Sequence, residues 1–195
     1  MTIKRTPILT AQALGLMVLM LTFGLSARAM LADDGDSKKG EDPASLLSQD
    51  VGTWTAKCKF WVAGPDSDPL LSDGTEVNHK LGESGWILSD FEADFGGQKF
   101  KGHSITGYNS ETKKISGTWV DTMSPRMITF EGSFDPATKS FIYEFDEVSP
   151  EGDKLRAKHV IQYKDGGRVM TAYSAPQSDP KKMAKMMEIT YTRKK

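Results

Sequence analysis

The feature that most constrains this chain is a two-residue alternation of apolar and polar side chains, repeated in short segments from Gly52 onward. A period of two is the period of a β-strand, because successive side chains point to opposite faces of a sheet. Short turns rich in Gly, Pro, Asn and Asp separate the segments and leave no room for a crossover helix. Neighbouring strands are therefore expected to pair antiparallel, as hairpins of a meander.

About ten such strands are expected, and many regular short strands favour a barrel or a sandwich. Closure into a barrel removes the exposed edges that an open sheet of this size would present. We therefore predict an all-β fold: an up-and-down antiparallel barrel preceded by a short helical turn at residues 43–47. The expected strands lie near residues 52–62, 74–81, 85–95, 98–108, 113–121, 126–134, 139–148, 154–164, 167–174 and 185–193.

The first residues have the pattern of a secretory signal peptide. Lys4 and Arg5 precede an uncharged apolar run at residues 13–25, and Ala27-Arg28-Ala29 fits a small-x-small cleavage site. The apolar run is shorter than the roughly 20 residues of a membrane span, so an uncleaved anchor is the less favoured alternative. We predict cleavage near Ala29 and export, which places the mature chain in the periplasm or outside the cell.

The remaining sequence divides into two parts. Residues 30–43 are rich in Asp, Lys, Gly and Ser and are predicted to be a disordered tether, and residues 44–195 are predicted to form the barrel domain. Residues 1–29 hold three basic and no acidic side chains, so their removal lowers the net charge from −1 to −4. A mildly acidic chain has no electrostatic reason to bind nucleic acid or, after cleavage, a membrane. A monomer is expected.

Several motifs in fixed order resemble a known family. Gly52-Thr53-Trp54, repeated as Gly117-Thr118-Trp119, is similar to the Gly-x-Trp motif of the calycins, which include the lipocalins. The more specific matches are Leu81-Gly82-x-x-Gly85-Trp86, Phe100-x-Gly102, Gly107-Tyr108-Asn109, Trp119-Val120-Asp121-Thr122-Met123, Phe130-Glu131-Gly132 and Met187-Glu188-Ile189-Thr190-Tyr191-x-Arg193. Their spacing over residues 46–193 resembles the uncharacterised bacterial family called domain of unknown function 1579. The resemblance implies a lipocalin-like barrel and brings no established activity or catalytic residues.

The alternation also predicts which side chains line the interior. We expect a small hydrophobic or amphipathic molecule to bind there through burial of apolar surface, with one or two polar groups to orient it. Trp119 and Asp121 share one strand face, which makes them the first place to look for a working site. The predicted cavity-lining residues are Trp54, Cys58, Phe60, His79, Trp86, Trp119, Asp121, Phe145, His159 and Tyr191.

Histidines and the single cysteine are the remaining candidates for chemistry. Facing histidines in a barrel can hold a metal or a haem iron, and His79, His103 and His159 are the three available. No zinc-type spacing accompanies them, so we expect no cofactor. Cys58 is the only cysteine, so no internal disulfide can form. It is expected to be a small buried apolar side chain rather than a nucleophile.

Two alternatives to ligand binding stay open at this stage. One is an enzyme in which a histidine acts as a general base near Asp121 or Cys58 inside the barrel. The other is a filled barrel that serves as a structural or interaction module, with an exposed apolar patch. The alternating acids Asp90, Glu92 and Asp94 are expected to form a solvated strand face.

Overall fold

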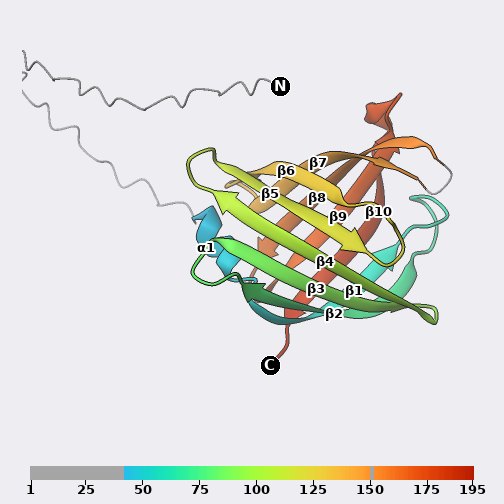
Figure 1. The fold of residues 1–195 in the computed structure, drawn as a ribbon. Helices are drawn as coiled ribbons and strands as arrows, with labels where there is room; N and C mark the ends of the chain where they lie inside the picture. The colour runs from blue at the N-terminus through green and yellow to red at the C-terminus, as the bar shows by residue number, and fades with distance from the viewer. Residues whose placement is uncertain (1–41, 150–151) are drawn as a thin grey trace, which may run out of the picture. The chain divides into compact units, whose positions relative to one another are not determined.

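The computed structural model describes residues 42–149 and 152–195, which form one short α-helix, one 3-10 turn and a closed barrel of ten antiparallel strands (Figure 1). This confirms the predicted fold class. The predicted signal peptide and all but the last two residues of the predicted tether lie outside the described residues.

The elements are α1 (Pro43–Ser48), β1 (Gly52–Phe60), β2 (Leu70–Lys80), β3 (Trp86–Phe95), β4 (Gln98–Asn109), β5 (Lys114–Asp121), β6 (Ile128–Asp135), β7 (Ser140–Val148), β8 (Lys154–Lys164), β9 (Gly167–Pro176), η1 (Pro180–Lys182) and β10 (Ala184–Arg193).

Closure comes from pairing between the first and last strands. Each strand pairs with its neighbours in the chain, and β1 also pairs with β10, so that Cys58 lies opposite Ile189 on one side and Ser72 on the other. Pairing around the whole circuit satisfies the backbone groups that a sheet edge would expose.

The two ends of the barrel differ. Helix α1 lies at one end, which we call the closed end, beside the tight turns that follow β2, β4, β6 and β8 (Figure 1). Asp42 caps the helix by accepting a hydrogen bond from the Ser45 N–H, and Leu46 and Leu47 are buried against Ile115 and Phe141 of the barrel core. The opposite end, which we call the mouth, carries the loops at residues 61–69, 122–127 and 177–183.

Two large rings inside the barrel pack directly against glycines of the neighbouring strand. A Cβ atom added to Gly102 would stand 2.2 Å from the Trp119 ring, and one added to Gly117 would stand 2.6 Å from the Phe130 ring. Only a residue without a side chain permits this close approach. The rings are therefore held along the inner surface of the barrel, where they line its interior.

Strand β2 departs from the predicted phase. It begins at Leu70, four residues before the predicted start, because residues 70–73 pair with the end of β1. Its inward face carries the buried Glu76 and Asn78, whereas His79 is exposed on the outer face. The prediction followed the more apolar face of this strand, but here the polar face is the buried one, and its partners described below explain why.

Candidate functional site

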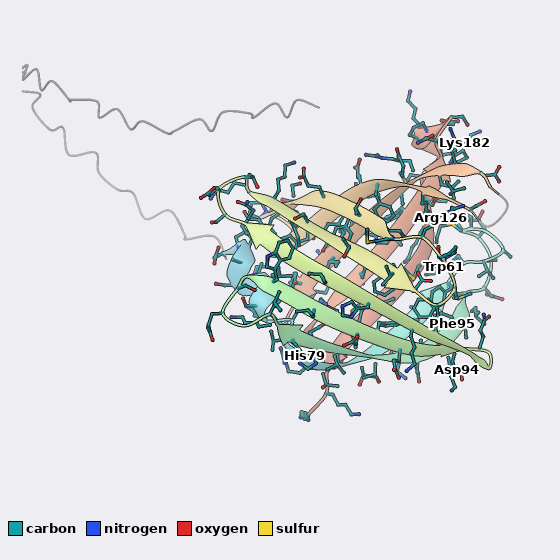
Figure 2. All side chains as sticks on the ribbon, viewed as in Figure 1. Trp61, His79, Asp94, Phe95, Arg126 and Lys182 are labelled. Carbon is teal, nitrogen blue, oxygen red and sulfur yellow. The ribbon has the colours of Figure 1, made fainter. Side chains whose placement is uncertain are left out.

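The mouth half of the interior has a continuous aromatic surface. The ring centroids of Phe60 and Phe95 lie 4.8 Å apart, those of Phe95 and Phe100 lie 5.1 Å apart, and Phe100 stacks on Trp119 at 6.3 Å. We call these four residues the aromatic wall. All four face inward and pack against the buried core cluster that contains Cys58 and Phe91, but they are only half-buried, so part of their surface stays exposed. Figure 2 labels Phe95 and Trp61, both at the mouth end of the barrel.

Three polar side chains face inward from β7, β8 and β9. The Ser174 hydroxyl donates a hydrogen bond to Glu147 Oε1 at 3.3 Å, and the His159 ring packs edge-on against Phe145 with centroids 4.9 Å apart. We call Glu147, His159 and Ser174 the polar wall. In the order of the ten strands β8 stands half a circuit from β3, so the polar wall faces the aromatic wall across the interior.

Burial shifts the pKa values of the two titratable side chains in the polar wall, His159 and Glu147. It lowers the pKa of His159 to about 4, so the imidazole is neutral at pH 7 with one nitrogen as donor and the other as acceptor. Burial also raises the pKa of Glu147, against the opposing effect of the Ser174 hydrogen bond. Within the described residues the His159 ring makes no hydrogen bond, which leaves both nitrogens free for a bound molecule.

A second polar cluster lies at the closed end. Arg168 pairs with both Asp50, at 3.2 Å between Nη1 and Oδ1, and Glu76. Tyr163 donates to Asp50 Oδ2 at 2.9 Å, and Asn78 donates to Glu76 Oε1 at 2.7 Å. We call these five residues the closed-end cluster. It explains the inward polar face of β2, because Glu76 and Asn78 are buried with charged and hydrogen-bonding partners.

Two arginines and a tryptophan complete this end. The Arg168 guanidinium lies 4.6 Å from the Trp54 ring and 4.3 Å from the Tyr191 ring, and Arg193 covers Trp54 at 4.4 Å. The Trp54 indole N–H donates to the Asp50 carbonyl at 2.7 Å. Trp54 and Tyr191 are thus buried in the closed end, where the arginines pack against their rings.

Comparison with known proteins agrees with this architecture. Residues 40–193 match the family described as protein of unknown function DUF1579. The chain belongs to the DUF1579 family. This confirms the resemblance seen in the motifs, and the ten-stranded barrel fits its lipocalin-like character. The comparison with curated proteins gave no match.

The motif Trp119-Val120-Asp121-Thr122-Met123 of this DUF1579 chain lies at the end of β5 and the start of the following loop. The Trp119 indole N–H donates to Asp121 Oδ2 at 2.9 Å, while Asp121 Oδ1 accepts from the backbone N–H groups of Met123 and Ser124 at 2.8 and 2.9 Å. Thr122 pairs with the Lys101 backbone through both its N–H and its hydroxyl. Asp121 therefore fixes the loop after β5 and orients Trp119, and both of its oxygens are already occupied.

Eight of the ten predicted lining residues face the interior of the DUF1579 barrel, and the structure separates them into two groups. Near the mouth lie Cys58, Phe60, Trp119, Asp121, Phe145 and His159, whereas Trp54 and Tyr191 belong to the closed end. The predicted inward positions of His79 and Trp86 are wrong. His79 is exposed, and Trp86 lies on Gly107 on the outer face with 40% of its surface exposed, beside a shallow groove that Ile105 also lines.

The histidines do not converge. His103 is on the outer face of β4, where its Nδ1 lies 2.9 Å from Asp90 Oδ1, and only His159 faces the interior. In the described part of the chain no group of three or more His, Cys, Asp or Glu residues is arranged to hold a metal ion. Absence of a haem or metal cofactor remains a prediction.

Cys58 is buried and free, as expected. Burial, and to a lesser degree the negative charge of Asp73, raises the pKa of the thiol to about 11. Since the thiolate is the nucleophile, Cys58 is unreactive near neutral pH. It contributes a small apolar side chain to the inner surface of β1.

The acids that alternate along β3 are on the outer face, as predicted. Asp90 contacts His103, Glu92 pairs with Lys101 at 2.6 Å, and Asp94 pairs with Lys99 at 2.7 Å. These are exposed ion pairs of the kind that contribute little to stability.

The sequence contained a signal for three of the site residues that were missed. Glu147 follows Phe141, Tyr143 and Phe145 at a spacing of two, and Ser174 follows Met170 and Ala172 in the same way, so both belong to inward faces. Arg168 is also in phase with Met170. Asp50 lies between α1 and β1, outside any alternating pattern, so periodicity could not have found it.

Large apolar side chains are exposed around the mouth. Leu71 is 68% exposed and Met127 is 64% exposed, and a groove runs between the mouth ends of β8 and β9, lined by Leu155 and Pro176 among others. Further exposed apolar residues on the loops and strand ends at the mouth are Val62, Leu70, Met123, Val148 and Met186. Among the described residues no helix is long and apolar enough to cross a membrane.

Proposed function

We propose that this chain binds a small apolar or amphipathic molecule in the mouth half of the barrel. The observation that carries the proposal is the aromatic wall, whose four rings face inward and yet remain half-buried. Together they form a continuous apolar surface at the mouth end against which a small molecule can pack. Partly exposed rings gain free energy when an apolar molecule replaces water against them.

The expected affinity comes mainly from apolar burial. At about 25 cal/mol per Å², a molecule that covers ~200 Å² of apolar surface gains ~5 kcal/mol before the costs of ordering are subtracted. His159 and Glu147 lie within the same half of the barrel and supply the polar contacts that orient the molecule. The exposed apolar side chains around the mouth extend the apolar surface outward to where the molecule would arrive.

The two alternatives find less support. An enzyme of the expected kind needs a histidine hydrogen-bonded to a carboxylate inside the barrel, whereas the described His–Asp pair, His103 with Asp90, is on the outer face. The filled barrel is less favoured because the aromatic wall keeps part of its apolar surface exposed and Glu147 has few partners.

Binding can be tested with a neutral fluorescent naphthylamine probe titrated into the purified chain. We expect saturable binding, which Phe100→Leu weakens by about fivefold because it removes aromatic contact surface worth ~1 kcal/mol. Trp86→Leu is the matched control, since it removes an aromatic ring from the outer face. Equal effects of the two substitutions, or no saturable binding, would contradict the proposal. Native mass spectrometry provides an independent test by detecting a copurified molecule.

Export is the proposed cellular context. The support is the sequence of residues 1–29, with its basic start, apolar run and small-x-small site. Expression of the full chain in a bacterial host, followed by fractionation and N-terminal sequencing, is expected to give an exported chain that begins at Met30. Recovery of the intact N-terminus in the cytoplasm would refute this.

A further inference from the structure

The charges inside the barrel are unevenly distributed. Among the described residues, the cationic side chains that face the interior are Arg168 and Arg193, and both are at the closed end. The mouth half contains two inward carboxylates, Asp121 and Glu147. A molecule bound in the mouth half therefore meets negative charge and no positive charge from the described inward residues.

Neither arginine is available to a ligand. Arg168 is 4% exposed and lies between two carboxylates and two aromatic rings. Arg193 donates hydrogen bonds to the backbone carbonyls of Val51 and Gln49. A ligand carboxylate would have to displace existing partners at the closed end, and nearer the mouth it would face carboxylates.

Of the two carboxylates, Glu147 is the one with an oxygen that can still accept a hydrogen bond. Its single hydrogen bond to a described residue is from Ser174 to Oε1, which leaves Oε2 without a partner in that part of the chain. Asp121 differs, because three donors already occupy its two oxygens. On the outer face of the same strand, Glu144 and Asp146 are both paired with Arg156 at 3.0 Å. A half-buried carboxylate with so few partners is stabilised when a cation binds to it.

The aromatic wall favours the same kind of ligand. The faces of Trp119 and Phe100 carry negative partial charge, so they repel a ligand carboxylate and accept an apolar body. His159, neutral at pH 7, can accept a hydrogen bond from an N–H group. The Glu147 carboxylate and the His159 nitrogen can both accept a hydrogen bond, so a ligand with N–H donors suits this half of the barrel.

From this arrangement we infer that the bound molecule is an amphipathic amine: its ammonium group contacts Glu147 and Ser174, and its apolar body lies on the aromatic wall. The inference rests on the proposed function and specifies its ligand class. It distinguishes this barrel from one that holds fatty acids, since a fatty-acid carboxylate would find no cationic partner among the described inward-facing residues of the mouth half.

The test uses three molecules with the same ten-carbon chain and different ends: decylamine, decanol and decanoate. Each is titrated against the chain at pH 7 by displacement of the neutral naphthylamine probe. We expect decylammonium to bind at least ~10-fold more tightly than decanoate, with decanol in between, from the ~1.5 kcal/mol or more of a charge-assisted hydrogen bond.

Glu147→Gln tests the assigned residue. The substitution keeps the shape of the side chain and its ability to accept from Ser174, but removes the charge. Decylammonium binding is expected to weaken ~10-fold, while decanol binding stays within about twofold and so shows that the barrel is intact. Glu144→Gln, on the outer face of the same strand, is the matched control and is expected to leave all three affinities unchanged.

The outcomes separate the inference from the function on which it rests. Decanoate binding as tightly as decylammonium would overturn the amine assignment and leave interior binding in place. Preference for the amine that survives Glu147→Gln would overturn the role of Glu147. Failure of all three molecules and of the probe to bind would overturn the proposed function itself.

Discussion

The closed end and the mouth half of this barrel both place charged groups inside, but they give those groups different numbers of partners. At the closed end Arg168 is shared by Asp50 and Glu76, which are further bound by Tyr163 and Asn78. In the mouth half Glu147 has one hydrogen bond and His159 has none among the described residues. Buried charges with opposite charges beside them are committed to the structure, whereas half-buried groups with few partners are available for binding. The number of partners thus separates a structural polar cluster from a candidate site.

The strongest test of this contrast removes Arg168. Arg168→Met leaves two carboxylates buried without their cation, so we expect a loss of about 3–5 kcal/mol in the free energy of unfolding. Arg156→Met is the matched control, because Arg156 also bridges two carboxylates but on the exposed face, and there we expect about 0–1 kcal/mol. Urea denaturation measures both. Equal losses would show that the closed-end cluster is not the stabilising feature that its burial indicates.

In the mouth half, His159 is the residue expected to make the free energy of unfolding depend on pH. Its folded pKa of about 4 is below its ordinary value of 6.5, so the unfolded chain takes up a proton first as the pH falls. The His159 contribution is fully present above pH 6.5 and is lost as the pH falls toward 4, by up to ~3 kcal/mol. The difference in unfolding free energy between the wild type and His159→Phe is expected to change over this window and to be constant above it.

Asp50 is expected to act in the opposite direction over nearly the same range. Burial is the main cause that raises its pKa from 3.8 to about 6, so the folded chain holds this proton more tightly than the unfolded chain. Its contribution to stability is therefore greatest below pH 4 and is lost as the pH rises through 6. Asp50→Asn is expected to remove this fall in unfolding free energy between pH 4 and 6. An unchanged pH profile would contradict the assignment to Asp50.

The smallest expected effect concerns the close approach of a ring to the backbone. Gly102→Ala places a methyl group where the Trp119 ring lies, so we expect a loss of about 1–3 kcal/mol and weaker probe binding as the aromatic wall is displaced. Gly85→Ala is the control, since a Cβ there meets nothing within 4 Å. Thermal unfolding of the two variants distinguishes them, and equal melting temperatures would count against the packing argument.

The architecture could be predicted because turn spacing and alternation are local. Short gaps such as residues 96–97 allow only antiparallel neighbours, and alternation on β1, β8 and β10 gave the correct inward faces. Alternation failed on β2, where the buried face carries Glu76 and Asn78, because the partners that permit their burial come from distant segments. Trp86 was wrongly predicted to face the interior, because its ring packs on the outer surface in the space that a side chain at Gly107 would occupy.

The site was predicted less completely than the fold for a related reason. Phe60, Trp119 and His159 could be placed by their strand phase alone. Which polar groups keep free capacity depends on contacts between strands, as Asp121 and Glu147 illustrate: two inward carboxylates, one occupied and one open. Sequence periodicity contains no information about those contacts.

The pairing of glycines with rings has a consequence for how sequences of this kind can diverge. The space that a side chain at Gly102 would need is taken by the Trp119 ring, so the two positions are coupled. A lineage that gains a side chain at the glycine must lose the ring opposite it, and a lineage that keeps the ring cannot change the glycine. In related chains these positions will vary together, although neither member of a pair is adjacent to the other in sequence.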